Sequence, residues 1–414
     1  ILKRCHCVIG ANYGDEGKGR VVDQLARETG SPLVCRFSSG PQAGHTVTLE
    51  DGRRHVFGHI GAGSFAGADT FLSRHFTSNP LLFRKEYSAL EKKCAIPSIH
   101  ADARGMVITP YDMMINQMIE EHRAGNRHGS CGIGFGETIE RNLNPSFTLT
   151  IGDLYDIKAL IERLIHIRTS WLPKRLVALG ICKIPKHWVE RVESKELLAD
   201  YIDATGFFLR TIKKCEGLPI APDMHVICEG AQGLLLDQDH EWFPHVTRSY
   251  TGIRNAMDVL QEAGIMDAHV TYVTRSYLTR HGAGPLPYET NNKPYAGIID
   301  ATNITNTFQG PLRFAMLDVD CIGEAIRKDL ALVPTSMQVT SGLAITCVDQ
   351  IGDQAFYMKD GSFRKKLPDQ FLEDLFSVAP FTFGITSYGP TRRTLRTYDF
   401  NKGGRYEQRT GSAR

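Results

Sequence analysis

Apolar and glycine-rich segments alternate at the start of the chain in a way that predicts two parallel strands. Residues 5–10 form a short apolar run that ends in Gly10, and residues 33–37 form a second run. The segment between them, residues 20–26, has the mixed apolar and polar spacing of a helix. Each run leads into a glycine-punctuated loop, and ligand sites in open α/β sheets lie at such carboxyl ends of strands. The pattern therefore predicts a binding site formed by these two loops.

The rest of the chain is expected to extend this sheet and to insert helices into it. Further strands are predicted at residues 224–228, 269–273 and 343–348, and mainly helical stretches at 110–122 and 154–215. Breaks are expected near Pro173 and Pro185, because proline does not continue the helical hydrogen-bond pattern. The sequence has no clear linker, so we expect one α/β domain over residues 1–414. Its central sheet should be mostly parallel, with helices on both faces and a helical insertion at about 110–215.

The composition limits the partners and the location of the protein. The 48 Lys and Arg residues nearly balance the 46 Asp and Glu residues, which argues against a bulk electrostatic grip on nucleic acid. No apolar run reaches the roughly 18 residues of a membrane span. Residues 1–7 are too short and too polar for a signal peptide. The ten cysteines are scattered, and Cys5 and Cys7 fit a strand better than a metal site, so we expect free thiols in the cytoplasm.

The segment 14–19 has the residues needed to hold phosphate. It reads Gly-Asp-Glu-Gly-Lys-Gly between the first predicted strand and the first helix. Glycines let backbone N–H groups converge, the helix N-terminus adds a positive dipole, and Lys18 neutralises charge. The segment is shorter than the GxxxxGK[ST] loop, and a tight turn with a surface lysine is the competing interpretation. Asp15 is a candidate Mg²⁺ ligand or general base, and alternatively a first-turn acid of the helix.

Three further segments combine small residues with polar ones. His45 lies at the end of the second glycine loop, where it is a candidate donor to a phosphoryl oxygen, although a single histidine is more often structural. Residues 229–233 with Thr247, and residues 128–134, offer close backbone approach and polar donors for phosphate or base edges. Each segment alone is compatible with a plain turn, so it is their combination that favours a nucleotide site.

Five motifs occur in the order found in adenylosuccinate synthetases, which this chain resembles. They are residues 13–19 (YGDEGKG), 43–46 (AGHT), 229–233 (EGAQG), 280–285 (RHGAGP) and 387–390 (SYGP), and residues 151–154 (IGDL) are similar as well. The resemblance spans about residues 7–393, nearly the whole chain. It implies a fold related to the P-loop NTPases and a carbon–nitrogen ligase that acts as a cytoplasmic homodimer. The substrates it implies are a purine nucleoside monophosphate, a nucleoside triphosphate and L-aspartate.

The resemblance also implies a reaction and a role for each matching residue. The triphosphate phosphorylates the 6-oxygen of the purine, and the amine of L-aspartate then displaces that phosphate. The implied catalytic residues are Asp15 as the base that removes the N1 proton, His45 as the acid at the transferring phosphoryl group, Lys18 on the phosphates and Gln232 on the monophosphate. Mg²⁺ would be held by Asp15 and the carbonyl of Gly44.

The remaining implied contacts fall into three groups. The triphosphate would be bound by Gly14, Glu16, Gly17, Lys18, Gly19, Gly44, Thr46, Asp349, Gly389 and Pro390. The monophosphate would be bound by Ser130, Cys131, Arg141, Gln232 and Thr247, with Arg141 standing near the arginine that a partner subunit supplies in the family. L-Aspartate would be bound by Thr307 and Arg313.

Several departures from the family pattern resemble a phage-type branch of it. Gln42 stands in place of the usual asparagine, Ser130 in place of a threonine, and Cys347 in place of the lysine that stacks on the guanine of GTP. Residues 129–132 (GSCG) and 244–249 (PHVTRS) are similar to the branch that makes 2-amino-2'-deoxyadenylosuccinate from dGMP with ATP or dATP. These positions favour dGMP as the substrate of a phage-encoded enzyme that acts in a host cytoplasm.

Two retained residues keep an IMP- and GTP-dependent synthetase open as the alternative. Asp349 still suits a guanine donor, and Asp15 is the residue of the IMP enzymes where some members of the phage-type branch have serine. A catalytically silent nucleotide-binding paralogue is disfavoured because Lys18, His45 and Gln232 are all present. A triphosphatase switch is disfavoured because the phosphate loop is short and no second metal aspartate follows a strand.

Overall fold

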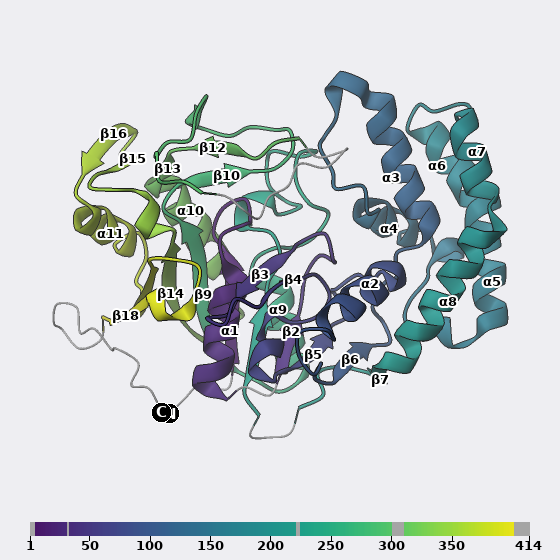
Figure 1. The fold of residues 1–414 in the computed structure, drawn as a ribbon, viewed down its shortest axis with the longest axis horizontal. Coiled ribbons are helices and arrows are strands. Elements are labelled where there is room, and N and C mark those ends of the chain that lie inside the picture. Colours follow the sequence, from purple (N-terminus) through teal and green to yellow (C-terminus); the bar gives the residue numbers. More distant parts are fainter. Residues whose placement is uncertain (1–4, 31–32, 221–223, 300–309, 401–414) are drawn as a thin grey trace.

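One large sheet organises the computed structural model, which describes residues 5–30, 33–220, 224–299 and 310–400 (Figure 1). Ten strands in these ranges run parallel, except that β18 at one edge is antiparallel to β17. The predicted mostly parallel α/β fold is therefore confirmed. In spatial order the strands are β18 (Leu395–Asp399), β17 (Phe383–Ser387), β14 (Gln338–Thr346), β9 (Asp267–Arg275), β1 (Cys5–Gly10), β8 (Val226–Glu229), β2 (Leu33–Arg36), β5 (Asp69–Leu72), β6 (Ile99–Asp102) and β7 (Ile212–Cys215).

Smaller sheets stand beside the large one. One contains β10 (Leu278–Arg280), β12 (Arg313–Ala315) and β11 (Glu289–Thr290), and a second contains β13 (Leu317–Asp318), β15 (Ala355–Lys359) and β16 (Ser362–Lys366). The strands β3 (His45–Thr48) and β4 (Arg54–Phe57) pair with each other.

Helices cover both faces of the large sheet, as the sequence predicted. They are α1 (Lys18–Thr29), α2 (Pro80–Leu90), α3 (Pro110–Arg123), α4 (Phe135–Asn142), α5 (Ile157–His166), α6 (Leu172–Ala178), α7 (Lys186–Glu193), α8 (Lys195–Thr211), α9 (Arg254–Glu262), α10 (Val319–Leu330) and α11 (Pro368–Phe376). Within the described ranges, every helix is too short or too polar to span a lipid bilayer.

Alternating side chains of the central strands form two hydrophobic cores. On β1, Cys5, Cys7 and Ile9 pack with helices α9, α10 and α11, whereas Val8 packs on the opposite face with α1, α2 and α3. This split follows from the two-residue period of a strand, which directs successive side chains to opposite faces. A strand buried on both faces explains why residues 5–10 form a nearly continuous apolar run.

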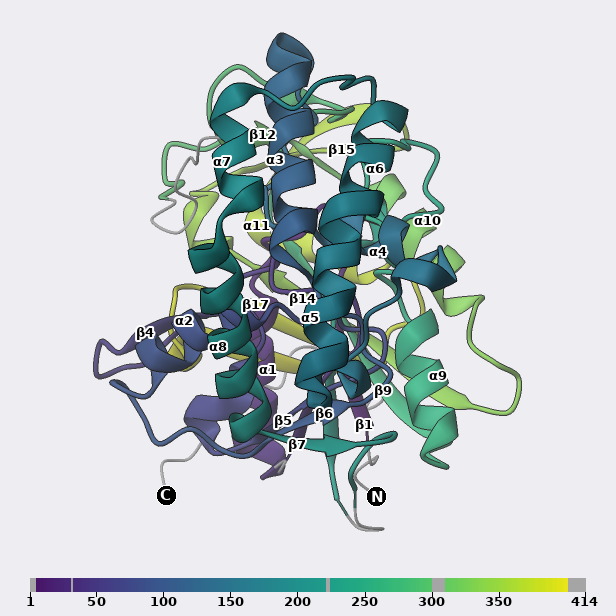
Figure 2. The same cartoon turned by 90° about the vertical axis from the view of Figure 1, so that its right-hand side faces the viewer.

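Helices α3 to α8 form a segment that lies between β6 and β7 in the sequence. This helical segment packs beside the edge of the sheet that β6 and β7 form (Figure 1, Figure 2). The prediction of helix over 154–215 is correct up to Thr211, but its end is wrong, because residues 212–215 form edge strand β7. Pro185 lies at the start of α7, as expected. Pro173 causes no loop: a π-helical turn, Ile167–Trp171, runs directly into α6. The wider turn accommodates a residue that has no N–H to donate.

Candidate active site

A cavity of about 730 Å³ lies at the carboxyl ends of the central strands. Its walls come from the loops after β1, β2, β8, β14 and β17, together with the end of β9. Parallel neighbours end at the same edge of a sheet, so loops far apart in sequence meet there. The predicted residues that line the cavity are Asp15, Glu16, Gly17, Lys18, Gly19, Gly44, His45, Thr46, Gln232, Asp349, Gly389 and Pro390.

The phosphate loop is held in a strained turn by its neighbours. Asp15 has φ of +56° and Gly17 has φ of +91°. The left-handed conformation costs a non-glycine residue of the order of 1 kcal/mol, so the surroundings must enforce it at Asp15. Arg275 Nε donates a hydrogen bond to the Asp15 carbonyl, and Thr346 Oγ1 donates to the Glu16 carbonyl at 2.8 Å. Gly17 begins helix α1 without a side-chain cap, which leaves helix N-terminal N–H groups for a ligand.

Lys18 and Glu16 are buried beside each other under this loop, each 3% exposed. Lys18 Nζ donates to the carbonyl of Gln232 at 2.6 Å, and Glu16 Oε1 accepts from the backbone N–H of Asn12 at 2.6 Å. Burial raises the pKa of Glu16 to about 7 and lowers the pKa of Lys18. A bound phosphate would therefore meet the lysine where little water screens its charge.

His45 is held by a carboxylate to which the sequence analysis gave no role. Its Nδ1 lies 2.6 Å from Oε1 of Glu229, and Glu229 Oε2 accepts from the backbone N–H of Ala62 at 3.0 Å. Arg36 Nε lies 3.9 Å from the same Oε2. Burial lowers the pKa of His45 to about 4, although Glu229 opposes this shift. The Nε2 of His45 is buried and makes no hydrogen bond to any described residue.

His281 is a second residue whose partner the sequence analysis missed. Its Nε2 lies 3.3 Å from Oδ2 of Asp15, and both residues line the cavity. Asp15 follows β1, and His281 follows β10, which comes shortly after β9. Strands β1 and β9 are far apart in sequence but pair with each other in the sheet. The motif order contained both residues but carried no information on which strands are adjacent.

One end of the cavity holds the residues after β14 for which the sequence predicted contacts with the base of the triphosphate. Cys347 has φ of +62° and lines this end together with Asp349. Arg20, also in the lining, donates hydrogen bonds to Ser387 Oγ and to the carbonyl of Gly389. The Arg20 contacts tie the start of helix α1 to the loop after β17, so both walls of this end are fixed to each other.

The predicted monophosphate residues Ser130, Cys131 and Thr247 do not line the cavity. Ser130 Oγ accepts a hydrogen bond from Asn116 Nδ2 at 2.8 Å, which ties its loop to helix α3. The Thr247 N–H donates to the carbonyl of Leu236 at 2.9 Å, and Leu236 itself lines the cavity. Thr247 is therefore joined through Leu236 to the cavity wall, and Ser130 is joined to helix α3. Gly14, the first residue of the phosphate loop, is also outside the lining, and a Cβ placed on it would lie 3.3 Å from Cα of Gln232.

The assignment of Arg141 to the monophosphate site is wrong. The residue is fully buried, and its guanidinium pairs with Asp112 at 2.9 and 3.0 Å. It also donates to the carbonyls of Phe147 and Val107, at 2.5 and 2.8 Å. A guanidinium committed to these partners cannot reach a ligand in another subunit. Its sequence position near the family's arginine reflects a structural role.

Arg313, predicted to bind L-aspartate, faces the loop after β10 instead of the cavity lining. Its guanidinium pairs with Glu289 and donates to the carbonyls of Gly282 and Gly284, at 3.1 and 2.9 Å. The other predicted aspartate contact, Thr307, lies outside the described residues.

An aromatic pair backs the phosphate loop. The rings of Tyr13 and Trp242 are stacked with centroids 5.6 Å apart and planes 7° apart. The guanidinium of Arg280 lies over both rings, 4.9 Å from that of Tyr13 and 5.6 Å from that of Trp242. Tyr13 directly precedes the phosphate loop, so these contacts couple it to the segment around Trp242 and to the loop that carries His281.

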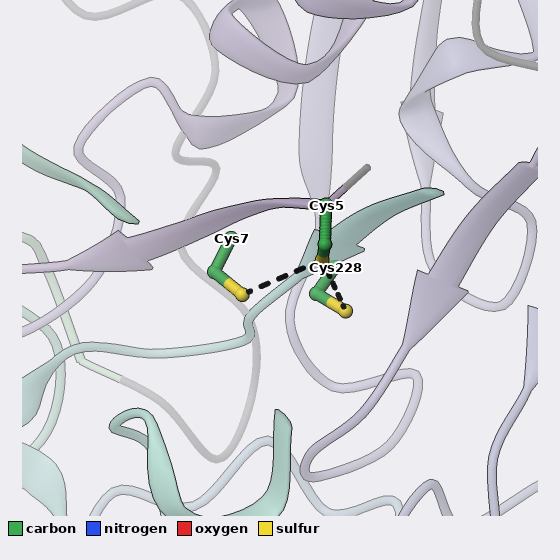
Figure 3. A group of neighbouring side chains, drawn as sticks. All are labelled: Cys5, Cys7 and Cys228. Carbon is green, nitrogen blue, oxygen red and sulfur yellow. Dashed lines mark hydrogen bonds between the residues drawn. The ribbon is translucent and has the colours of Figure 1, made fainter. Parts of the chain in front are cut away.

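The N-terminal cysteines lie on strand β1, in the hydrophobic core. Cys5, Cys7 and Cys228 lie together on β1 and β8, with Sγ–Sγ distances of 3.9 Å from Cys5 to Cys7 and 3.7 Å from Cys5 to Cys228 (Figure 3). All three are fully buried, and burial with thiol–thiol contacts raises the pKa of Cys5 well above its usual value. The intervening His6 points to the opposite face of the strand, because strand side chains alternate. The interpretation of Cys5 and Cys7 as strand residues is confirmed.

The donor set at the predicted metal position suits Mg²⁺. Asp15 and Gly44 both line the cavity, and they offer a carboxylate and a backbone carbonyl. Mg²⁺ prefers oxygen ligands and takes few of them from protein, with water and phosphate oxygens completing its shell. The side chain of Asp15 is 34% exposed and so is open to an incoming ion.

Comparison with known proteins decides the family. The family model described as Adenylosuccinate synthetase matches residues 7–382. The chain belongs to the adenylosuccinate synthetase family. The protein is thus an enzyme, a carbon–nitrogen ligase of the adenylosuccinate synthetase type. An adenylosuccinate synthetase from Stenotrophomonas maltophilia (strain R551-3) is 30% identical over 354 residues, which cover 83% of this chain and 76% of that protein.

Solved structures confirm the fold expected of an adenylosuccinate synthetase. A fully ligated adenylosuccinate synthetase from Plasmodium falciparum aligns with a TM-score of 0.69, covering 95% of this chain and 99% of that one. The succinoaminodeoxyadenylate synthetase of cyanophage S-2L, bound to dGMP and to dATP as an energy donor, aligns with a TM-score of 0.58 and covers 95% of both chains. Each is 17% identical to this chain, so the likeness concerns the fold alone.

Proposed function

We propose that this enzyme joins L-aspartate to C6 of dGMP, with ATP or dATP as phosphoryl donor, to give 2-amino-2'-deoxyadenylosuccinate. The observation that carries the donor assignment is Cys347, which lines the cavity beside Asp349 where the family pattern has a lysine for guanine. The GSCG and PHVTRS segments at residues 129–132 and 244–249 support the dGMP assignment through their likeness to the phage-type branch. The cyanophage enzyme with the same fold binds dGMP and dATP.

The chemistry proceeds in two displacements. In the first, the 6-oxygen of the purine forms a bond to the γ-phosphorus and the nucleoside diphosphate leaves, while Asp15 accepts the N1 proton. In the second, the uncharged amine of L-aspartate forms a bond to C6, the bond between C6 and the phosphorylated oxygen breaks, and phosphate leaves together with one proton of the amine. Positioning and charge neutralisation supply most of the catalysis in phosphoryl transfer. Lys18 is buried beneath the phosphate loop and provides a cation for the phosphates.

His45 contributes a proton donor at the transferring phosphoryl group. Its Nδ1 is committed to Glu229, so Nε2 can donate only when the ring is an imidazolium. Burial lowers the pKa of His45 and so favours the neutral ring. An anionic triphosphate beside Nε2 reverses this preference, and the carboxylate of Glu229 then stabilises the charged ring.

Asp15 and the carbonyl of Gly44 would hold Mg²⁺, which when bound neutralises phosphate charge. Gln232, which lines the cavity, would contact the monophosphate, and the assignment of Ser130, Cys131 and Thr247 to it stays a proposal. For L-aspartate the assignment to Arg313 and Thr307 stays a proposal, as does a homodimer.

A second candidate is an ordinary synthetase that uses IMP and GTP. It is favoured by the name of the sequence relative, which is called an adenylosuccinate synthetase, and by retention of Asp15 and Asp349.

A substrate panel tests the proposal. The full chain is incubated with L-aspartate and Mg²⁺ and with each pairing of dGMP, GMP or IMP with ATP, dATP or GTP. Phosphate release gives the rate, and mass spectrometry identifies the succinylated product. We expect the highest kcat/KM with dGMP and an adenine donor. Turnover with IMP alone would refute the dGMP assignment, and no phosphate release with any monophosphate would favour a catalytically silent paralogue.

A further inference from the structure

We infer that His281 is a positioning residue that holds the carboxylate of Asp15 in place for proton transfer. The inference rests on the proposed role of Asp15 as the N1 base. It concerns a contact that the motifs did not predict, the 3.3 Å approach of His281 Nε2 to Asp15 Oδ2. Contacts between catalytic groups are often long in an empty site and shorten when substrate binds.

The loop that carries His281 is fixed from several sides. Arg313 donates to the carbonyls of Gly282 and Gly284, as described above, and Arg280 Nη1 donates to the carbonyl of Pro285 at 2.6 Å. The N–H of Ala283 donates to the carbonyl of His128 at 3.1 Å. His281 is therefore presented from a rigid support, which is what a group that orients a catalytic side chain requires.

Close glycine packing adds to this rigidity. A Cβ placed on Gly129 would lie 2.6 Å from Cα of Gly282, so the two backbones touch where a side chain would separate them. Gly129 also has φ of +72°. The segment GSCG at 129–132 thereby supports the His281 loop from outside the cavity, in addition to any role near the monophosphate.

The backbone of Asp15 is equally fixed, whereas its side chain has fewer contacts. Arg275 holds the Asp15 carbonyl, and the residue keeps φ of +56°. Its carboxylate is 34% exposed in the cavity, and the described contacts of that carboxylate include only His281 as an ion-pairing partner. Without His281, rotation about the Asp15 side-chain bonds would spread the two oxygens over several orientations.

The contact also distinguishes the two carboxylate oxygens. His281 approaches Oδ2, so Oδ1 is the oxygen left open toward the purine edge. A carboxylate has about four lone-pair positions, so one contact with His281 leaves positions for the purine edge and for a metal ion. His281 thus orients the carboxylate through its contact with Oδ2.

The test compares His281→Leu, which removes the N–H donor, with His281→Gln, which retains one. The matched control is His187→Leu. His187 Nε2 lies 3.2 Å from Glu121 Oε2, which is the same kind of histidine–carboxylate pair. The side chain of His187 is 62% exposed and does not line the cavity. Circular dichroism first establishes that each variant is folded. Rates are then measured with whichever monophosphate the wild-type enzyme uses.

We expect His281→Leu to lower kcat by about 10- to 100-fold, the scale of a misplaced catalytic group, while the KM values for triphosphate and L-aspartate stay within about threefold. His281→Gln should recover most of the lost kcat, and His187→Leu should match wild type. In crystals, the Asp15 carboxylate should leave its position in His281→Leu and keep it in His281→Gln.

Wild-type kcat in folded His281→Leu would overturn the inference, and so would a His281→Gln variant as slow as His281→Leu. An Asp15 side chain that keeps its position in His281→Leu crystals would also overturn it, independently of activity. A wild-type enzyme that ligates no purine monophosphate would instead refute the proposed function, so the two failures are distinguishable.

Discussion

Replacing Glu229 with glutamine tests the coupling between His45 and its buried carboxylate. The change keeps the size of the side chain but removes its charge. Glu229 and Arg36 are fully buried and His45 is 5% exposed, so solvent cannot substitute for the missing charge. Burial alone would raise the pKa of Glu229, but His45 and Arg36 outweigh it and hold that pKa below its usual value. The native side chain is therefore an ionised carboxylate at neutral pH.

The size of the effect follows from the 2.6 Å contact between His45 Nδ1 and Glu229 Oε1. A hydrogen bond to a charged group is worth about 1.5–3 kcal/mol. The pair is strongest when His45 is charged and donates to the phosphoryl group, so Glu229→Gln costs more in the transition state than in the resting enzyme, where it also lowers stability. Since about 1.4 kcal/mol corresponds to a factor of ten in rate, kcat should fall by about 10- to 150-fold.

A second buried histidine–glutamate pair supplies the control. His59 Nδ1 lies 3.1 Å from Glu86 Oε2, and neither residue lines the cavity. Both Glu229→Gln and Glu86→Gln should lower the free energy of unfolding in urea, because each removes a buried charge partner. Only Glu229→Gln should lower the kcat for phosphate release. A folded Glu229→Gln enzyme within threefold of wild-type kcat would refute the reasoning.

Three other substitutions give separate outcomes. Asp15→Asn should lower ligation by at least about 10³-fold, the scale of a lost general base, while calorimetry still detects triphosphate binding; substantial residual turnover would remove Asp15 from the base role. Arg141→Leu should lower the unfolding free energy by about 3–5 kcal/mol, because it leaves Asp112 buried and unpaired. The KM of the folded variant for the monophosphate should not change, and a large rise in this KM would contradict the structural role of Arg141. Burial raises the pKa of Asp329 to about 6, above the unfolded value of about 3.9. The unfolding free energy of wild type should therefore fall by about 2 kcal/mol relative to Asp329→Asn as pH rises from 4 to 7; a constant difference between the two proteins in urea titrations would argue against this shift.

The residues predicted best from the sequence are those in glycine loops directly after strands. Asp15, Lys18 and His45 fall in such loops, and the parallel sheet brings the loops to one edge. A strand that is buried on both faces has a conspicuous apolar run, so β1 and β2 were also predictable. Edge strand β7 was not, because a strand with one open side has no such run and residues 212–215 continue the pattern of a helix.

Pairings between distant loops could not be predicted from one sequence. The contacts of Glu229 with His45 and of His281 with Asp15 depend on the order of strands in the sheet, which local patterns do not contain. The error at Arg141 has a related cause. Sequence position placed the residue near a known arginine, but the direction of a side chain on a helix depends on what packs against it, here Asp112.

The stack of Trp242 on Tyr13 gives the protein an intrinsic optical probe of its phosphate loop. The other two of its three tryptophans, Trp171 and Trp188, are buried in the helical segment between β6 and β7. Trp242 is the one in contact with a residue that directly precedes Gly14. Ligands that move the loop therefore change the surroundings of one tryptophan while the emission of the other two stays constant. Nucleotide binding can be followed by fluorescence in the unlabelled enzyme, and a Trp242→Phe variant provides the blank.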